Sequence, residues 1–303
     1  MKLLLLSTPE RARAWQPLFD AAGETLVVGE DAVTDPAEIT HIACWMPPAD
    51  PGRYPNLRAV ISTGAGVDQM PTLPPGVALT RTIAPGIDNM VRDWVVMATL
   101  MLHRDMPRYL EQAAQGDWRA HPIRAAASAR VGVMGMGRIG RAAAASLSAL
   151  GFDVAGYSRS GDPVDGIAIH GQSDLPAFLA HSDLLICLLP LTGETRGILG
   201  DNLFGSLPEN AALIHAGRGA QLDMTALSRA LDGGQLRAAM LDVTDPEPLP
   251  QDHWAWRDPR VIITPHVAAH TDATEGARHA LAVIEASRTG APLPGFIDRA
   301  RGY

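Results

Sequence analysis

Residues 131–140 read V-G-V-M-G-M-G-R-I-G, and this stretch constrains the fold of the chain more than any other. An apolar run ends in glycines spaced G-x-G-x-x-G, and an alanine-rich segment follows. This order predicts a buried strand, a tight turn and a helix that ends at Gly151. Gly135 would form the turn, Gly137 would let the backbone approach a pyrophosphate, and Gly140 would let helix and strand pack closely. The pattern therefore predicts a dinucleotide site, with phosphate at the helix N-terminus.

Length and composition narrow the class of protein. A chain of 303 residues is long enough for two domains. Its formal net charge of −8 argues against a nucleic-acid partner. Cys44 and Cys187 lie in apolar runs, which predicts buried thiols in a reducing compartment rather than a disulfide or a metal site. The apolar start at residues 3–6 is too short for a signal peptide, and no run could span a bilayer. We therefore expect a cytoplasmic protein with no membrane partner.

Short apolar runs alternate with helical segments, which predicts an α/β fold with parallel sheets. A first small unit should end near residue 90, and the dinucleotide unit should start near residue 130. Thr8, Pro9 and Glu10 predict a helix start, and a long helix over residues 89–115 should kink or break at Pro107. Strands are expected at residues 3–6, 25–28, 42–45, 57–62, 77–80, 131–134, 153–158, 184–189, 211–215, 238–243 and 261–264, and a final helix at residues 271–289.

The end of the second strand of a dinucleotide fold reads the adenosine ribose. An acid there would bind the 2′-hydroxyl and repel a 2′-phosphate. Here the strand runs into Ser158-Arg159-Ser160, and Arg159 can bind a phosphate through charge-assisted bonds. We therefore expect NADPH rather than NADH. The alternative is a solvated loop arginine, and the nearby Asp162 counts against the phosphate interpretation.

Four further features lie after predicted strands, where open α/β sheets bind ligands. Glycines at alternate positions in residues 62–68 can form a nest of N–H groups for an anion, although an ordinary glycine turn is the simpler interpretation. Arg218, Glu247 and His266 each follow a later strand. Singly, each is as consistent with a surface turn or a structural role as with catalysis.

Five motifs in order carry a resemblance to a known family. They are G-x-G-R-I-G, L-L-P-L-T-x-E-T over residues 188–195, A-G-R-G, L-D-V-x-x-x-E-P-L and T-P-H-V-A. Together they resemble the D-isomer-specific 2-hydroxyacid dehydrogenases over nearly the whole chain. Within that family, the chain is most similar to bacterial glyoxylate/hydroxypyruvate reductases of the A type, through residues 45–48, 64–68, 158–160 and the tail 298–303.

The resemblance implies two Rossmann-like domains with a cleft between them. Residues 1–95 and 270–303 would form a discontinuous, flavodoxin-like substrate domain, and residues 96–269 an NADP-binding Rossmann domain. The activity implied is NADPH-dependent reduction of small 2-oxo acids, glyoxylate to glycolate and hydroxypyruvate to D-glycerate. A homodimer formed through residues 97–118 is also implied.

The resemblance assigns roles to single residues. Arg218 would bind the 2-oxo acid, His266 would donate the proton, and Glu247 would hold the imidazole and favour its protonated form. The Ala65 and Gly66 amides would bind the substrate carboxylate. Trp45, with Met46, would narrow the pocket, or else both would be core residues. The residues expected at the cofactor are Gly135, Gly137, Arg138, Ile139, Gly140, Ser158, Arg159, Ser160, Leu188, Pro190, Thr195, Ala216 and Asp242, and no metal is expected.

Departures from the family and competing functions complete the prediction. Asp93 stands where relatives more often have Glu, and Arg92 is unusual for the family at its position. Gln221 replaces an apolar residue of the family, and we expect this third change to be neutral. A reductase for a bulkier 2-oxo acid and a non-catalytic NAD(P)H-sensing module remain alternatives. A formate dehydrogenase would have Gln at position 247, where this chain has Glu, so that activity is not favoured. A phosphoglycerate dehydrogenase would have an acid after the second strand of the dinucleotide unit, and this chain has none there. A metal site on His266 and His270 lacks a third ligand.

Overall fold

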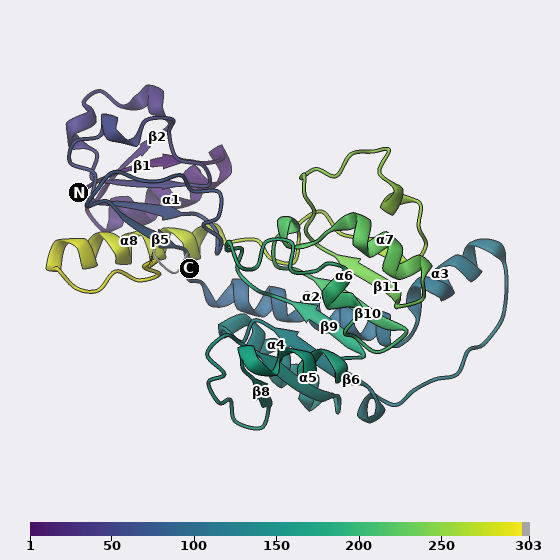
Figure 1. The fold of residues 1–303 in the computed structure, drawn as a ribbon. Coiled ribbons are helices and arrows are strands. Elements are labelled where there is room, and N and C mark those ends of the chain that lie inside the picture. The colour runs from purple at the N-terminus through teal and green to yellow at the C-terminus, as the bar shows by residue number, and fades with distance from the viewer. Residues whose placement is uncertain (299–303) are drawn as a thin grey trace. The chain divides into compact units, whose positions relative to one another are not determined.

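The computed structural model describes residues 1–298, and the chain divides into two compact units (Figure 1). One unit comprises Met1–Ile87 and the segment from His270 onward, and the other comprises Asp88–Ala269. The tail residues 299–303, which carry part of the family resemblance, lie outside the described residues. None of the helices in the described part of the chain has the length and apolar character needed to cross a membrane.

The unit that contains both chain ends is built on a five-stranded sheet in the order β2-β1-β3-β4-β5. Every neighbouring pair is parallel, and this order is that of flavodoxin-like folds. All five strands were expected from the sequence, because each is an apolar run between turn residues. Their bounds are β1 Lys2–Leu6, β2 Thr25–Val28, β3 His41–Cys44, β4 Ala59–Ser62 and β5 Ala78–Arg81.

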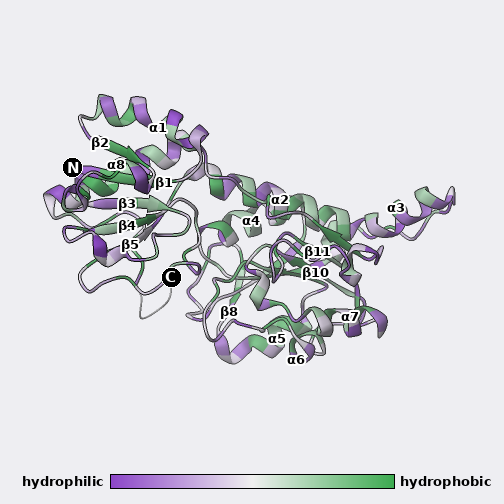
Figure 2. Ribbon diagram, turned by 90° about the horizontal axis from the view of Figure 1, so that it is seen from above, coloured by the Kyte–Doolittle hydropathy of each residue, from purple (hydrophilic) through white to green (hydrophobic). Residues whose placement is uncertain are grey.

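Two helices, α1 (Pro9–Ala21) and α8 (Ala273–Thr289), cover one face of this sheet. The Thr8 hydroxyl accepts a hydrogen bond from the Arg11 N–H and caps α1, as the sequence predicted. Hydrophilic and hydrophobic residues alternate along α1 (Figure 2), and the apolar side packs on the sheet and on α8. The buried residues of the two helices include Ala12, Trp15, Phe19, Ala277, Ala280, Val283 and Ile284.

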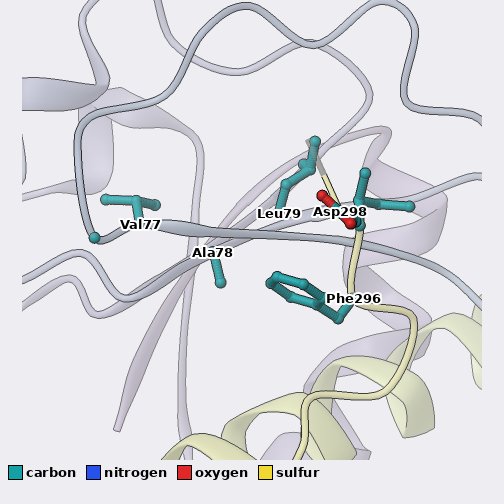
Figure 3. Close-up of a pocket in the computed structure, with 7 residues that line it drawn as sticks. Val77, Ala78, Leu79, Phe296 and Asp298 are labelled. Carbon is teal, nitrogen blue, oxygen red and sulfur yellow. The ribbon is translucent and has the colours of Figure 1, made fainter. Parts of the chain in front are cut away.

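The open edge of this sheet, β5, is paired by the C-terminal segment. Phe296 forms an antiparallel bridge with Thr80, and the Ile297 N–H donates to the Leu79 carbonyl oxygen at 2.9 Å. Figure 3 shows the shallow hollow that forms between this segment and β5, with the exposed Phe296 ring beside it. The segment satisfies backbone groups that an edge strand would otherwise leave unpaired.

The second unit is built on a seven-stranded sheet in the order β12-β11-β10-β9-β6-β7-β8. All pairs are parallel, and the order is the Rossmann order with one further strand, so the predicted fold class is confirmed. Strand β8 was not expected; it is an edge strand of three residues that is only partly buried. The bounds are β6 Arg130–Met134, β7 Asp153–Tyr157, β8 Ala168–His170, β9 Leu184–Cys187, β10 Ala211–His215, β11 Leu236–Leu241 and β12 Val261–Ile263.

The long helical segment before this sheet is broken where the sequence suggested, although it starts earlier. Helix α2 runs over Pro85–His103 and α3 over Met106–Gln115. The break falls at Asp105, which has a φ of 58°, because Pro107 fits the first turn of α3 and not the interior of a continuous helix. The other helices are α4 Arg138–Ala149, α5 Leu175–Ala180, α6 Asp201–Phe204 and α7 Met224–Asp232.

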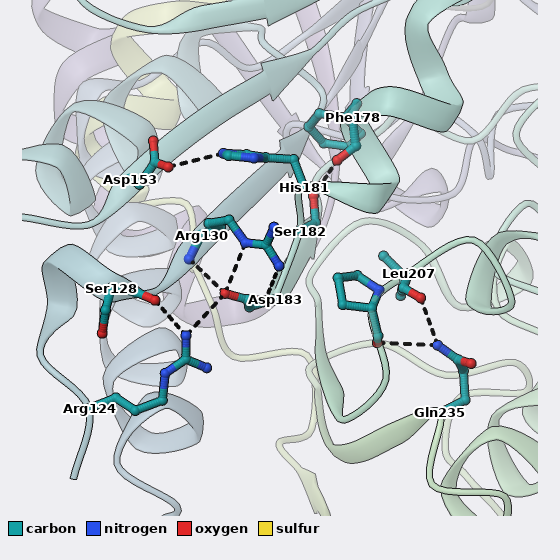
Figure 4. A network of polar contacts seen from close by, with 11 residues as sticks. Arg124, Ser128, Arg130, Asp153, Phe178, His181, Ser182, Asp183, Leu207 and Gln235 are labelled. Atoms are coloured by element: carbon teal, nitrogen blue, oxygen red, sulfur yellow. Dashed lines mark hydrogen bonds and ion pairs between the residues drawn. The ribbon is translucent and has the colours of Figure 1, made fainter.

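Ion pairs occupy the amino edge of this sheet (Figure 4). Asp183, just before β9, accepts hydrogen bonds from the backbone N–H and the guanidinium of Arg130, and pairs with Arg124. Burial alone would raise the pKa of Asp183, but the hydrogen bonds from Arg130 outweigh burial and lower it. Asp183 therefore stays ionised and joins β6 to β9 at the amino edge. The opposite, carboxyl edge is the one at which open α/β sheets bind ligands.

Candidate active site

The glycine turn between β6 and α4 has the geometry that its sequence predicted. Gly135 has a φ of 103°, and a Cβ there would lie 2.8 Å from the Leu188 carbonyl carbon. A Cβ on Gly140 would lie 1.9 Å from the Gly135 oxygen, so helix and strand pack as closely as backbones allow. The turn lies at the point where the strand order reverses, between β6 and β9.

The N-terminus of α4 is open to a ligand. Gly137 is its N-cap and provides no capping side chain, and a Cβ there would meet no protein atom within 4 Å. The first-turn N–H groups, those of Arg138 and Ile139 among them, therefore face free space at the positive end of the helix dipole. These features fit a pyrophosphate. The Arg138 guanidinium is engaged elsewhere, in an ion pair with Asp88 at 2.8 Å.

The loop after β9 closes on itself beside this turn. The Leu188 N–H donates to the Met134 carbonyl oxygen at 2.8 Å, which holds the loop to β6. The Thr195 hydroxyl donates to the Pro190 carbonyl oxygen at 2.7 Å and accepts from the Thr192 N–H at 2.8 Å. Leu188, Pro190 and Thr195 thus belong to one ordered loop at the switch point, where dinucleotides bind in this fold.

The loop after β7 carries the residues predicted to read the ribose. Arg159 is half exposed, and its Nη1 lies 3.1 Å from the Glu194 Oε2 in an ion pair that the sequence did not predict. The Ser160 hydroxyl donates to Asp162 Oδ2 at 2.7 Å, and Ser158 Oγ accepts from the Gly161 N–H at 3.2 Å. The loop thus presents a guanidinium and two hydroxyls, with two carboxylates close by.

Arg218 lies directly after β10, at the start of a short 3-10 turn over Gly219–Gln221. Its backbone N–H donates to Gln221 Oε1 at 2.8 Å, and its Nη1 donates to the Gly217 carbonyl oxygen at 2.8 Å. The side chain is half buried. Ala216 precedes this loop, and its N–H donates to the Cys187 carbonyl oxygen of β9.

Glu247 and His266 meet as the resemblance implied. His266 Nδ1 lies 2.9 Å from Glu247 Oε2, and the two side chains are 38% and 39% exposed. Glu247 Oε1 accepts from the Thr244 N–H at 3.1 Å, which fixes the carboxylate to the loop after β11. One ring nitrogen of His266 is therefore held by a carboxylate, and the other is left for a substrate.

Asp242 supports the loop that carries His266. This residue is 2% exposed, and its carboxylate accepts from the Thr264 hydroxyl at 2.6 Å and from the backbone N–H groups of Val267 and Ala268 at 2.9 Å each. His266 itself has a φ of 52°, a left-handed conformation that costs free energy and persists only in a well-fixed loop. The cofactor contact that the resemblance implies for Asp242 stays a prediction.

Three neighbouring strands thus place the three candidate residues at one edge of the seven-stranded sheet. Arg218 follows β10, Glu247 follows β11 and His266 follows β12. A Cβ on Gly219 would lie 1.9 Å from the Thr244 carbonyl oxygen, so the loops after β10 and β11 are in direct backbone contact. The arrangement offers an anion-binding guanidinium and a carboxylate-held imidazole at the carboxyl edge.

The glycine turn of the other unit follows β4. Ser62 Oγ donates to the Gly66 carbonyl oxygen at 2.7 Å, and Gln69 Nε2 donates to the Trp45 carbonyl oxygen at 3.1 Å. Within residues 1–298, the N–H groups of Ala65 and Gly66 donate to no protein acceptor. An anion is the natural partner for such adjacent N–H groups.

Trp45 and Met46 are not core residues, because they are 43% and 57% exposed. The Trp45 ring packs on Gly64, where a Cβ would lie 2.8 Å from the ring carbon Cζ3. This contact places an aromatic side chain directly beside the glycine turn. The interpretation of Trp45 and Met46 as core residues is therefore wrong, and the interpretation that they narrow the substrate pocket stays a prediction.

Sequence reasoning missed two residues of this edge, Gln221 and Glu194. Gln221 stands where the family has an apolar residue, and the sequence alone predicts a neutral change. The side chain is fully buried, however, and a buried polar side chain must find hydrogen-bond partners. Glu194 lies in the motif after β9, and only the folded structure brings it to Arg159.

Comparison with known proteins identifies the family. Residues 96–268 match the family model described as "D-isomer specific 2-hydroxyacid dehydrogenase, NAD binding domain". The chain is 37% identical over 280 residues to glyoxylate/hydroxypyruvate reductase A of Yersinia enterocolitica, covering 89% of each protein. It is 33% identical to the protein of that name from Salmonella newport, covering 100% of both.

Solved structures give the same result. A D-isomer specific 2-hydroxyacid dehydrogenase from Xanthobacter autotrophicus Py2, in complex with NADPH and MES, is 34% identical with a TM-score of 0.92, covering 100% of this chain and 99% of the other. An NADPH-dependent glyoxylate/hydroxypyruvate reductase from Sinorhizobium meliloti, in complex with NADP and sulfate, has 34% identity, a TM-score of 0.91 and the same coverage. The chain belongs to the D-isomer specific 2-hydroxyacid dehydrogenase family.

Proposed function

We propose that the protein reduces small 2-oxo acids with NADPH, glyoxylate to glycolate and hydroxypyruvate to D-glycerate. The observation that carries the proposal is the 2.9 Å pair of His266 and Glu247, with Arg218 at the end of a neighbouring strand. Full-length relatives with the name glyoxylate/hydroxypyruvate reductase A support the substrate class.

Each of the three residues has a distinct task in this proposal. The planar guanidinium of Arg218 pairs with the substrate carboxylate and polarises the 2-oxo group. NADPH bound at this site would supply the hydride that reduces the carbonyl carbon of the oxo acid. His266 gives its Nε2 proton to the carbonyl oxygen, which completes the hydroxy acid. Glu247 keeps the ring oriented through Nδ1 and stabilises the imidazolium before the proton is transferred.

The proposed cofactor site agrees with the open space at Gly137 and the free N–H groups of α4. The pyrophosphate would lie on Arg138 and Ile139 N–H groups, and the 2′-phosphate on Arg159 with the hydroxyls of Ser158 and Ser160. NADPH- or NADP-bound relatives support the choice of nucleotide. The loop residues Leu188, Pro190, Thr195 and Ala216 would line the same site.

The substrate carboxylate is proposed to bind the N–H groups of Ala65 and Gly66. The exposed Trp45 ring, packed on Gly64, would limit the size of the group that can lie beside this turn. A small substrate such as glyoxylate fits that restriction better than an aromatic 2-oxo acid.

We also propose a role for each domain, a homodimer and a cellular location. Residues 96–269 are proposed as the NADP-binding domain, and residues 1–95 with 270–303 as the substrate domain. A homodimer through residues 97–118 would bury apolar side chains that are exposed here, among them Met97, Leu100, Leu110 and Trp118. The free, buried thiols of Cys44 and Cys187, whose pKa values burial raises to about 12, support a cytoplasmic location.

The decisive experiment follows NADPH oxidation by its absorbance, with glyoxylate, hydroxypyruvate, pyruvate and a bulky aromatic 2-oxo acid in parallel. The series is repeated with NADH. We expect turnover of the two small acids with NADPH. Turnover only of the aromatic acid would replace the substrate assignment, and NADPH binding without turnover of any acid would indicate a sensing module.

A further inference from the structure

Gln221 is a fully buried polar residue at the end of the turn that begins at Arg218. Its side chain lies among three backbone groups from two loops. Its Oε1 accepts from the Arg218 N–H at 2.8 Å, and its Nε2 donates to the Leu189 and Pro190 carbonyl oxygens at 3.2 and 3.0 Å. Both ends of the amide are therefore occupied, and no solvent competes for them.

These bonds join the loop after β10 to the loop after β9. An apolar side chain of the same size would leave the Arg218 N–H and the Leu189 carbonyl oxygen without this partner beside a fully buried side chain. The Pro190 carbonyl oxygen would keep its hydrogen bond from the Thr195 hydroxyl. The amide is thus suited to fix where the Arg218 backbone lies relative to the loop at the switch point.

His215, the last residue of β10, makes a second side-chain contact with the backbone of the Arg218 loop. It is fully buried, and burial lowers its pKa to about 4, so the ring is neutral near pH 7. Its Nε2 lies 2.9 Å from the Arg218 carbonyl oxygen. Because a carbonyl can only accept, Nε2 carries the proton and donates it. The N–H and the C=O of Arg218 are therefore both held by buried side chains.

The packing around Gln221 leaves little room for the loop to shift. A Cβ on Gly217 would lie 2.3 Å from Gln221 Oε1 and 3.1 Å from the Leu189 carbonyl oxygen. The Arg218 loop can approach the amide this closely only because a glycine precedes Arg218.

We propose that Gln221 is a positioning residue for Arg218, which clamps the loop after β10 to the loop after β9 and so aims the guanidinium at the oxo-acid carboxylate. This inference rests on the proposed function for the role of the guanidinium. The clamp itself can be tested without activity. A small displacement of a binding group costs about 100-fold in rate when it spoils the reactive geometry.

The test compares Gln221→Met with a matched control, Gln235→Met. Gln235 also donates to two consecutive backbone carbonyl oxygens, those of Leu207 and Pro208 at 2.9 and 3.2 Å, but at the amino edge of the sheet (Figure 4). Both variants keep the length of the side chain and remove the amide. Thermal unfolding measures the stability that each loses.

The first readout is amide hydrogen exchange of the peptide that covers residues 216–222. We expect faster exchange in Gln221→Met and wild-type exchange in Gln235→Met. The second is steady-state kinetics with NADPH and glyoxylate. Gln221→Met should lower kcat/KM by about 10- to 100-fold, mostly through KM for glyoxylate, while NADPH affinity measured by fluorescence changes much less.

A second variant, Gln221→Glu, keeps an acceptor for Arg218 and regains a donor only when the carboxyl is protonated. Its activity relative to wild type should therefore rise as the pH falls. Wild-type exchange and KM in Gln221→Met, or equal kinetic losses in the two Met variants, would overturn the proposal. If wild type turns over no oxo acid, the proposed function fails, and hydrogen exchange alone decides whether Gln221 clamps the loop.

Discussion

The loop after β12 and the loop after β7 are held in opposite ways. The first carries His266 and is fixed from inside by Asp242, a 2% exposed carboxylate that accepts three hydrogen bonds. The second carries Arg159 and is held by exposed pairs, Arg159 with Glu194 and Ser160 with Asp162. Buried, fully satisfied groups give precise placement, whereas exposed ion pairs contribute only about 0–1 kcal/mol.

The difference matches what each loop must do. A proton donor has to lie within hydrogen-bond reach of the reacting oxygen, so its loop must be preorganised. A phosphate-binding arginine can adjust its long side chain to the ligand after contact. Substitutions in the loop after β12 should therefore have large effects on turnover, and those in the loop after β7 should have small effects on cofactor choice.

The largest effect is expected for His266→Asn. Removal of the general acid should lower kcat for glyoxylate reduction by about 100- to 10,000-fold. NADPH affinity, measured by its fluorescence on titration, should stay near wild type because the residue makes no proposed contact with the nucleotide. His270→Asn is the control, since this exposed neighbour should leave kcat unchanged. A kcat within a few fold of wild type in His266→Asn would show that another group is the acid.

Asp242→Asn tests whether the buried carboxylate fixes the His266 loop. The amide would keep one acceptor oxygen but turn an NH₂ toward an N–H donor, so about 1–3 kcal/mol of stability should be lost. Urea unfolding measures that loss, and kcat should fall by about 10- to 100-fold as the loop moves. Unchanged stability with a large loss of NADPH affinity would instead favour a direct cofactor contact for Asp242.

Glu247→Gln alters the charge beside His266 and keeps the shape of the side chain. The carboxylate can only accept from His266 Nδ1, whereas an amide presents either an oxygen or an NH₂ group to that nitrogen and so fixes the ring less well. The kcat for glyoxylate reduction should therefore fall by about 10- to 100-fold, while NADPH affinity measured by fluorescence stays near wild type. A kcat near that of wild type would mean that Glu247 does not hold the ring.

The same contrast explains how much the sequence could predict. Local signals were sufficient for the glycine turn, because Gly135 and Gly140 are required by backbone contacts within one β-turn-α element. The Arg218, Glu247 and His266 set needed the family resemblance, since nothing in spacing shows that three separate strands end side by side. Their place at one edge depends on the sheet order, which is a property of the whole fold.

The supporting contacts were harder to predict. Gln221 and Asp242 act through hydrogen bonds to backbone groups of other loops, and such groups carry no sequence signal. The ion pair of Arg159 with Glu194 joins residues of different loops. The carboxylate beside Arg159 belongs to the loop after β9 and not to the end of β7, where the sequence pattern of the fold places an acid. A search of the β7 end alone could not find it.

The smallest effect is expected for Glu194→Gln, which removes the carboxylate paired with Arg159. Glu194 competes with a 2′-phosphate for the guanidinium and repels it, so the variant should prefer NADPH over NADH more strongly than wild type. An exposed pair of about 0.2–1 kcal/mol corresponds to about a 1.4- to 5-fold change in the ratio of kcat/KM values. The gain should shrink at high ionic strength, because exposed charges are screened.

Asp162→Asn is the comparison variant. It removes a neighbouring carboxylate, which is hydrogen-bonded to Ser160, and leaves the ion pair of Arg159 with Glu194 in place. A weaker NADPH preference in Glu194→Gln would mean that the acid orients Arg159 before the cofactor arrives. The loop after β7 would then be preorganised like the loop after β12, and exposure alone would not distinguish an adaptable binding loop from a fixed one. A stronger NADPH preference that disappears at high ionic strength would support the contrast between a preorganised loop after β12 and an adaptable loop after β7.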